Sequence, residues 1–233
     1  MRMTRSRMQQ RRPECGSTRQ RKDSMTYPII RDVITYWDRL RADRDMPDRV
    51  EIDPREICDL LSYMFILDRT RPGVVRFRLS GTHLNELMGM EVRGMPVRAL
   101  FELPERERLM TNVERVFAGP AAVHLHLEAG GHGRSALTGR MVLLPLRGTD
   151  DTISRALGVL TTDGLIGQPP RRFRVARADA TPLLSGKAVL DAVFDADRKN
   201  RGLAEAAEPF RGAGPRHTPG KRPRLYVVKG GKP

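Results

Sequence analysis

Two histidines two positions apart are the residues whose type and spacing come closest to a chemical site. His124 and His126 lie in the segment 122–128, whose alternating apolar residues predict a strand. Side chains at positions i and i+2 of a strand share one face, so both imidazoles could ligate one metal ion or sense pH. The apolar residues between them take the core face, which leaves the histidines on the other side with Glu128. We interpret that side as a solvated or interface face, and we predict no metal site.

Other motifs that could support catalysis are incomplete. The segment 185–188 lacks the earlier glycine and the following Ser or Thr with which a phosphate-binding loop holds phosphate and magnesium. The glycine-rich segment 130–133 is predicted to be a hairpin turn, and no helix N-terminus follows it to receive a pyrophosphate. We therefore predict no catalytic residues and no enzyme activity.

Cysteine use and hydropathy indicate a cytoplasmic protein. Cys15 and Cys58 lie far apart in the sequence, and Cys15 stands in a basic tail, so a disulfide framework is not expected. We interpret Cys58 as a small buried hydrophobic residue. No apolar run reaches about 18 residues, and the N-terminal segment lacks the apolar core of a secretory signal, so we expect no membrane association.

The elements that must position these residues follow from hydrophobic periodicity. Five antiparallel strands interrupted by helices are expected, which makes the fold class α+β. One short helix ends at Gly89, where a left-handed C-terminal residue is needed. The expected strands are 63–68, 74–80, 122–128, 136–146 and 156–162, and the expected helices are 29–42, 54–61, 82–88 and 104–118.

The helix at 29–42 carries one apolar stripe, which includes Val33, Trp37 and Leu40. The strand segment 141–146 is apolar at both parities, so both of its faces must be covered. Central helices cover one face, and the 29–42 helix is the candidate lid for the other, from the same chain or from a partner subunit. We predict that Val33, Trp37 and Leu40 form an interaction helix and that the chain self-associates as a homodimer or binds a signalling-protein partner.

Four segments stand in a characteristic order along the chain. They are Tyr36-Trp37-Asp38-Arg39-Leu40-Arg41, Asp53-Pro54-Arg55-Glu56-Ile57, the strand and the glycine-terminated helix from Val75 to Gly94, and the stretch from Gly94 to Leu100-Phe101. Their order resembles the PAS domain family, and specifically its alphaproteobacterial, nearly stand-alone type. The resemblance covers about residues 28–163 and implies a five-stranded antiparallel sheet with central connecting helices and an N-terminal flanking helix.

The resemblance also implies a space between sheet and helices that can hold haem, flavin or a small metabolite. Relatives that bind haem present a histidine from the long connecting helix, and the segment 104–118 contains none. Photochemical flavin relatives use a cysteine in the central segment, and 82–101 contains none. Both cofactors are therefore disfavoured, and an unidentified small ligand remains open. The predicted pocket residues, for which core filling is the alternative, are Met88, Met90, Leu109, Met110, Val113 and Met141.

Charge changes at the edges of the resemblance. Residues 1–24 carry 8 Lys and Arg against 2 Asp and Glu, residues 25–163 carry 19 against 20, and residues 164–233 carry 15 against 6. The formal net charge of +14 therefore belongs to the tails. We predict a basic disordered tail at 1–27, a PAS-like domain at 28–163 and a basic, largely disordered C-terminal extension after it.

Two functions remain open at this stage. The first, which we favour, is a non-catalytic sensory, signalling or protein-interaction module that has no attached output domain and responds to a partner or a small ligand. The alternative is a nucleic-acid-associated regulator whose basic tails contact phosphate and whose PAS-like body acts as a dimeriser. The few aromatic residues of the tails stand mostly away from the basic clusters, which disfavours stacking on bases.

Overall fold

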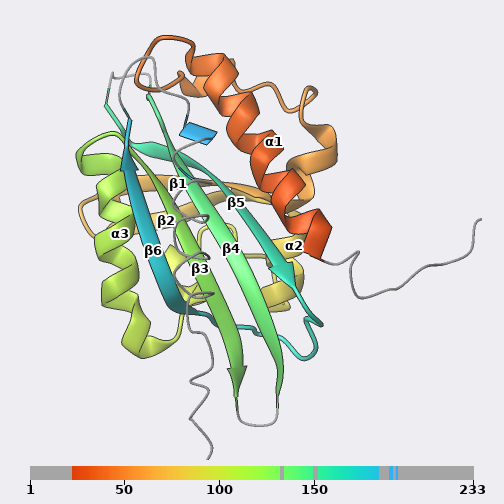
Figure 1. The fold of residues 1–233 in the computed structure, drawn as a ribbon. Helices are drawn as coiled ribbons and strands as arrows, with labels where there is room; N and C mark the ends of the chain where they lie inside the picture. Colours follow the sequence, from red (N-terminus) through yellow and green to blue (C-terminus); the bar gives the residue numbers. More distant parts are fainter. Residues whose placement is uncertain (1–22, 132–133, 149–151, 184–188, 191–192, 194–233) are drawn as a thin grey trace, which may run out of the picture.

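The structure, a computed structural model, consists of one antiparallel sheet with helices on both faces (Figure 1). It describes residues 23–131, 134–148, 152–183, 189–190 and 193. The strands lie in the order β2-β1-β5-β4-β3-β6, and each neighbouring pair is antiparallel. The strands are β1 (Met64–Arg71), β2 (Val74–Ser80), β3 (Ala121–Gly131), β4 (Arg134–Leu146), β5 (Arg155–Asp163) and β6 (Arg174–Pro182). The α-helices are α1 (Asp23–Arg41), α2 (Thr82–Met88) and α3 (Arg106–Ala118), and the 3-10 helices are η1 (Arg49–Glu51), η2 (Cys58–Tyr63), η3 (Val97–Leu100) and η4 (Leu103–Glu105).

The predicted α+β class and the five predicted strands are confirmed, and β6 is a sixth strand that the sequence analysis missed. The short helix expected at 54–61 is instead a turn followed by η2. Asp53 Oδ1 accepts a hydrogen bond from the backbone N–H of Arg55 at 2.9 Å, and this local turn replaces the first turn of a helix. α2 ends as predicted, because Gly89 adopts the left-handed conformation with φ 69°.

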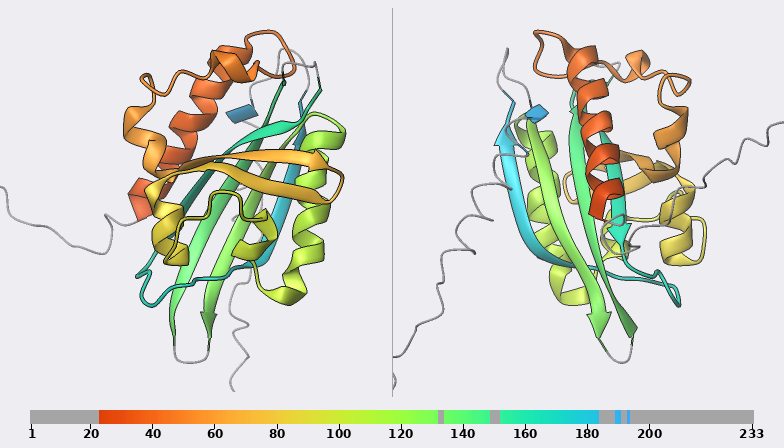
Figure 2. Two further views of the ribbon diagram at one scale, coloured as in Figure 1. Left: turned by 180° about the vertical axis from the view of Figure 1, so that it is seen from behind. Right: turned by 45° about the vertical axis from the view of Figure 1, so that its right-hand side comes forward.

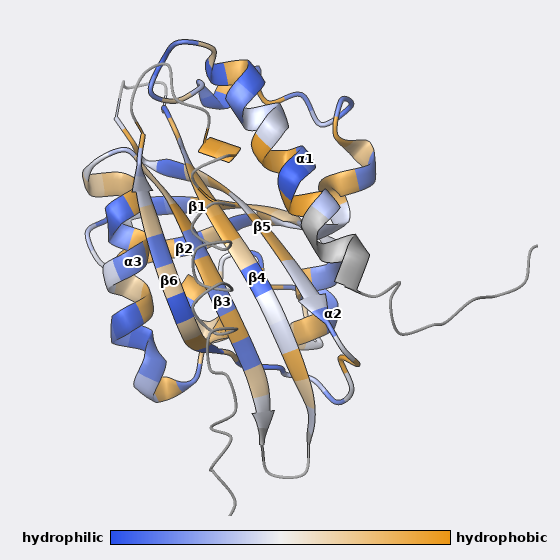
Figure 3. Cartoon of the chain, in the orientation of Figure 1, coloured by the Kyte–Doolittle hydropathy of each residue, from blue (hydrophilic) through white to orange (hydrophobic). Residues whose placement is uncertain are grey.

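The two faces of the sheet carry separate hydrophobic cores. The inner core lies between the sheet and helices α2 and α3, and the outer core lies between the sheet and α1 (Figure 2). β4 supplies both cores by alternation, since Met141 and Leu143 belong to the inner core and Val142, Leu144 and Leu146 to the outer. This whole stretch of β4 is buried, as its two-sided apolar pattern predicted. Figure 3 shows hydrophobic and hydrophilic residues alternating along β3 and β6 instead.

Helix α1 covers the outer face of its own sheet. Val33 and Trp37 are fully buried in the outer core, and Leu40 packs partly buried against it. Trp37 Nε1 also donates a hydrogen bond to Pro145 O at 3.1 Å. The structure therefore corrects the predicted interaction helix. The apolar stripe is occupied within the chain, because the sheet beneath α1 offers it a complementary apolar face.

The polypeptide after β5 stays in the fold, which corrects the predicted domain end at residue 163. β6 pairs with β3 from one end of β6 to the other. Phe173 and Val175 are buried in the inner core, against α3 and the central segment. Phe173 donates its backbone N–H to Leu100 O at 3.0 Å, and Phe173 O accepts the N–H of Glu102 at 3.0 Å. Backbone hydrogen bonds and buried side chains thus both hold this segment in the domain.

Arg171 shows that part of the basic extension has a structural role. Its side chain is only 2% exposed. The guanidinium donates hydrogen bonds to Ile166 O at 2.9 Å, to Ala129 O at 3.0 Å and to Ser135 O at 2.6 Å. A buried guanidinium needs this many acceptors to offset its desolvation. Arg171 therefore ties the connection after β5 to the β3–β4 hairpin.

Two further boundaries differ from the prediction or lie outside the described residues. α1 begins at Asp23, so the last part of the predicted disordered tail at 1–27 is helical. Asp38 Oδ2 accepts the backbone N–H of Val189 at 2.9 Å, which brings the extension onto α1 as well. Residues 1–22 and 194–233 are not among those described, so the predictions for them stay predictions. Within the described part of the chain, no helix is long and apolar enough to cross a membrane.

Candidate ligand pocket

The residues predicted to line a ligand pocket lie mostly in the packed inner core. The four that are buried there are Met88, Leu109, Val113 and Met141. Met110 packs partly buried against them, and Met90 is 57% exposed. Neither of the two pockets described next is lined by any of these residues. The surroundings of all of these residues except Met90 fit the alternative interpretation, in which they fill the hydrophobic core.

A pocket of about 180 Å³ lies on the outer face instead, between the 49–61 segment and strands β1 and β2. Its walls are mainly apolar, and Leu61 and Leu79 at its lining are among the exposed large hydrophobic residues of the chain. A cavity of about 150 Å³ with apolar walls is large enough to bind benzene. The pocket is lined by Arg49, Ile52, Pro54, Ile57, Leu61, Met64, Phe65, Ile66, Leu79, Ser80, Gly81 and Leu157.

Arg49 is the one charged side chain in this lining. Burial lowers the pKa of Arg49 below its usual value, and repulsion from Arg155 and Arg78 adds to the effect. Arginine nevertheless stays protonated at any physiological pH. Among the described residues, no ion pair joins Arg49 to an acidic side chain. The pocket therefore combines apolar walls with a half-buried positive charge.

The neighbouring charges leave this region positive. Asp68 lies 3.7 Å from Arg78 and also 3.7 Å from Arg155, so one carboxylate is shared between two guanidiniums. Arg49 adds a third cation to the same group. An anion at the mouth of the pocket would therefore gain attraction from the local field, while its apolar part would be removed from water. The arrangement suits a small molecule with an apolar body and a carboxylate.

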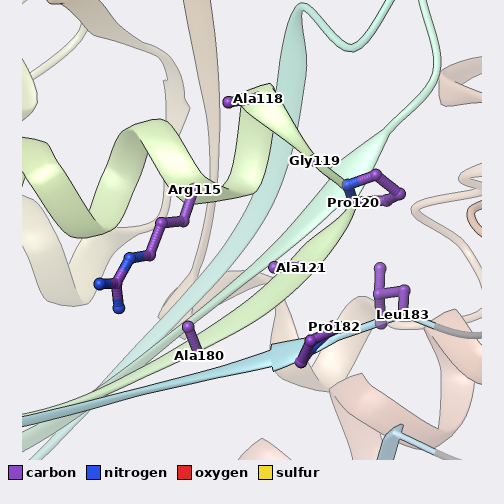
Figure 4. A pocket seen from close by; sticks show the side chains of 8 residues that line it. All are labelled: Arg115, Ala118, Gly119, Pro120, Ala121, Ala180, Pro182 and Leu183. Carbon is purple, nitrogen blue, oxygen red and sulfur yellow. The ribbon is translucent and has the colours of Figure 1, made fainter.

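A second, larger hollow of about 660 Å³ lies where α3 ends and β6 approaches β3 (Figure 4). Its lining consists mainly of alanine, glycine and proline residues, and Arg115 is its one charged side chain. The Arg115 guanidinium is also 3.5 Å from Asn112 Oδ1, to which it donates a hydrogen bond. This surface lacks the combination of enclosure and concentrated charge found at Arg49. It is lined by Arg115, Ala118, Gly119, Pro120, Ala121, Ala180, Pro182 and Leu183.

The histidine pair does not lie on a solvated face. His124 is 2% exposed and His126 is half-buried, with ring centroids 4.5 Å apart. β6 pairs with β3 beside the two histidines and places Asp179 directly opposite His124 in the register. Because the sequence did not predict β6, Asp179 was not expected as a neighbour of the two histidines. The expectation of a solvated face is therefore corrected, and the pair lies at the junction between β3 and β6.

Comparison with known proteins places the fold. The model of a family described as PAS domain matches residues 25–161, which is more than half of the chain. The chain belongs to the PAS domain family. The match begins inside α1 and ends inside β5, so the PAS family model includes the five predicted strands and leaves out β6. No curated protein matches the chain.

Solved structures of light-oxygen-voltage proteins are among those to which this PAS domain is similar. A structure of an RNA-binding light-oxygen-voltage receptor matches with 16% identity and a TM-score of 0.36, and the match covers 49% of this chain and 35% of that one. The light state of the aureochrome 1 light-oxygen-voltage domain matches with 13% identity and a TM-score of 0.35, covering 47% of this chain and 88% of that one. A light-oxygen-voltage domain studied with a flavin analogue matches with 14% identity and a TM-score of 0.37, covering 63% and 93%.

The cofactor predictions rest on residue types in the PAS domain. The long connecting helix α3 contains no histidine, and the described segment 82–101 contains no cysteine. The expectation that haem and flavin are disfavoured therefore stays a prediction. Cys58 is exposed, which corrects its interpretation as a buried hydrophobic residue. It stands at the start of η2, and its thiol points toward Asp59 Oδ1 at 3.7 Å.

His83 on α2 gives the PAS domain a pH-dependent stability. Burial lowers the pKa of His83, and the attraction of Glu86 offsets this only in part. Because the unfolded chain then binds the proton more readily than the folded chain, stability is lost as pH falls through about 6.5. We expect a lower free energy of unfolding at pH 5.5 than at pH 7.5, measured in urea. His83→Gln keeps a hydrogen-bonding group near Thr162 Oγ1, which lies 3.1 Å from His83 Nε2, and should reduce this loss. Equal pH dependence in the two proteins would contradict the assignment.

Proposed function

We propose that this PAS domain chain is a non-catalytic sensory or protein-interaction module whose ligand site is the outer-face pocket. The observation that carries the proposal is the half-buried guanidinium of Arg49 in an otherwise apolar lining. A half-buried cation without a paired carboxylate loses part of its hydration, and a bound anion would offset that loss. The ligand we propose is a small carboxylic acid with an apolar body of about the size of benzene.

The segment 49–61, which forms the roof of the pocket, connects the proposed ligand site to α1. The roof segment 49–61 contacts α1, because the backbone N–H of Asp53 donates to Tyr36 Oη at 2.8 Å. Ile52 and Ile57, which line the pocket, also pack in the outer core beneath α1. A ligand that binds one position of this roof better than another would shift the population of α1 positions by its difference in affinity. The response would then be read by a partner at the α1 side of the domain.

Benzoate and hexanoate are suitable probes, with benzamide as the uncharged control. We expect calorimetric titration to detect binding of one acid per chain and much weaker binding of benzamide. Arg49→Gln should weaken binding of the acids about 10-fold or more, since it removes a charge-assisted hydrogen bond. Arg93→Gln, at an exposed arginine outside the pocket lining, is the matched control and should bind as the unsubstituted chain does.

Two results would count against this proposal. If neither acid binds at millimolar concentration, the pocket is not a carboxylate site. If Arg49→Gln and the unsubstituted chain bind alike, the acid is held elsewhere. Native mass spectrometry of the chain purified from its own cells, before and after denaturation, would show in addition whether a small ligand accompanies it.

The remaining functional expectations stay predictions. The nucleic-acid alternative depends on the tails, which lie largely outside the described residues. Three arginines of the extension that are described have partners inside the domain: Arg171 on backbone carbonyls, Arg174 at 3.6 Å from Glu128, and Arg177 at 2.8 Å from Asp179. These three charges therefore give no added support to phosphate binding. Cytoplasmic location and association with a second copy of the chain or with a signalling-protein partner are parts of the proposal.

A further inference from the structure

We propose that His124, His126 and Asp179 bind one divalent transition-metal ion at the junction of β3 and β6. One ligand atom from each of the three side chains lies within 4.8 Å of the other two. The strand register explains this grouping. His124 and His126 are on one face of β3 at i and i+2, and Asp179 on β6 is directly opposite His124.

The ligand types select the class of metal. Two imidazoles and one carboxylate are a set that Zn²⁺ and other divalent first-row transition metals accept, with positions left open for water. Bonds of about 2.0–2.1 Å in tetrahedral geometry put ligand atoms about 3.4 Å apart. The three side chains must therefore close by an ångström or so, which rotation about side-chain bonds can supply.

The arginines around the site further restrict which metal ions can bind. Arg177 Nε lies 2.8 Å from Asp179 Oδ2, and Arg140 on β4 is opposite His126 in the register. A carboxylate has two oxygens, so Arg177 can hold one while the other binds the metal, as outer-shell partners commonly do. Both guanidiniums repel a cation, however. This repulsion disfavours Mg²⁺ and Ca²⁺, which bind through oxygen and charge, more than metals that form strong bonds to imidazole.

The site joins the PAS body to a strand outside the family match. His124 and His126 lie within the matched residues 25–161, whereas Asp179 is on β6, beyond them. The third ligand therefore exists only while β6 is paired with β3. A metal ion that binds all three would stabilise the docked strand, because it binds the folded arrangement and not the separated one. This inference does not depend on the carboxylate ligand proposed above.

The test uses the full chain without an affinity tag, freed of metal by a chelator and then dialysed. Zn²⁺ is titrated in competition with a chromophoric chelator, and Co²⁺ is added separately for its visible absorption. We expect one high-affinity equivalent of Zn²⁺, a Co²⁺ spectrum of nitrogen and oxygen ligands, and a rise in the melting temperature with Zn²⁺. Asp179→Asn and His126→Gln should each weaken this equivalent about 100-fold or more, because losing a ligand costs at least as much as losing an outer-shell partner.

Two controls separate this site from adventitious binding. His83→Gln and Cys58→Ser remove other metal-binding side chains and should leave the high-affinity equivalent unchanged. Circular dichroism of Asp179→Asn and His126→Gln verifies that both variants are folded, and the buried His124 is left intact for the same reason. The proposal is overturned if the unsubstituted chain binds no stoichiometric Zn²⁺, or if both site variants bind it with the unsubstituted affinity. Binding lost with His83 or Cys58 instead would also overturn it.

Discussion

A fragment that ends at Asp163 is expected to lose most of the stability of the longer chain. It lacks Phe173 and Val175, which are 0% and 2% exposed in the inner core. Deleting one buried aromatic side chain costs about 3–5 kcal/mol, and whole domains are stable by only about 5–15 kcal/mol. The fragment also exposes the edge of β3 and leaves the carbonyl groups that Arg171 contacts without this donor. We therefore expect residues 23–163 to unfold without a cooperative transition, whereas residues 23–193 melt cooperatively.

Urea unfolding followed by circular dichroism measures this difference directly. Phe173→Ala in the full chain is the matched substitution, and it should lower the free energy of unfolding by about 3–5 kcal/mol. Arg172→Ala, at the exposed neighbouring position, should change it by less than about 0.5 kcal/mol. A cooperative melt of 23–163 with stability close to that of 23–193 would restore the boundary predicted from charge and pattern.

β6 was missed because its sequence gives a weak strand signal. Between Phe173 and Pro182, six of the eight residues are alanine, arginine or aspartate, and only Val175 and Thr181 are typical strand residues. The preceding Pro-Pro-Arg-Arg run predicted an exit from the domain, and here it is a connection around the edge of the sheet. The alternation of Arg174, Val175 and the following residues was the available signal. An edge strand buries less apolar surface than a central one, so its pattern is easily taken for a linker.

Central strands were predictable because their environment repeats along the sequence. Met141 to Leu146 is apolar at both parities, and only a strand covered on both faces explains that pattern. Which element covers the outer face of this strand was not predictable from the sequence. An amphipathic stripe reports that a face is buried but not whether the same chain or a second one buries it, so the α1 lid needed the tertiary structure.

Sequence periodicity alone could not locate a ligand pocket, for a related reason. Periodicity identifies which residues face the interior, and Leu109, Val113 and Met141 do so, but it cannot distinguish dense packing from a cavity. The sequence does not identify Arg49 as a pocket residue, because its position near Arg78 and Arg155 depends on three separate elements of the fold. A charged side chain that lines a pocket can be recognised only when its burial and the charges around it are both known.

Trp37→Ala is expected to destabilise the domain strongly, by about 3–5 kcal/mol. Trp37 is fully buried in the outer core, beneath the guanidinium of Arg41, which lies 5.4 Å from its ring centroid. Trp37→Phe is the matched variant, because it keeps an aromatic ring and removes the hydrogen bond to Pro145 O. It should cost less than Trp37→Ala, with about 1–3 kcal/mol arising from the carbonyl left without its donor.

Urea unfolding followed by circular dichroism, together with sedimentation of each variant, distinguishes a lid from a dimer interface. If α1 is a lid on its own sheet, the free energy of unfolding falls in the order unsubstituted chain, Trp37→Phe, Trp37→Ala, and the loss does not depend on protein concentration. Trp37 is the chain's single tryptophan, so its emission should shift to longer wavelength when the unsubstituted chain unfolds. If Trp37→Ala instead turns a dimer into a monomer of nearly unchanged stability, the helix contacts a second subunit and the intramolecular packing is wrong. Because Trp37 Nε1 and Pro145 O belong to one chain and lie 3.1 Å apart, we expect the first result.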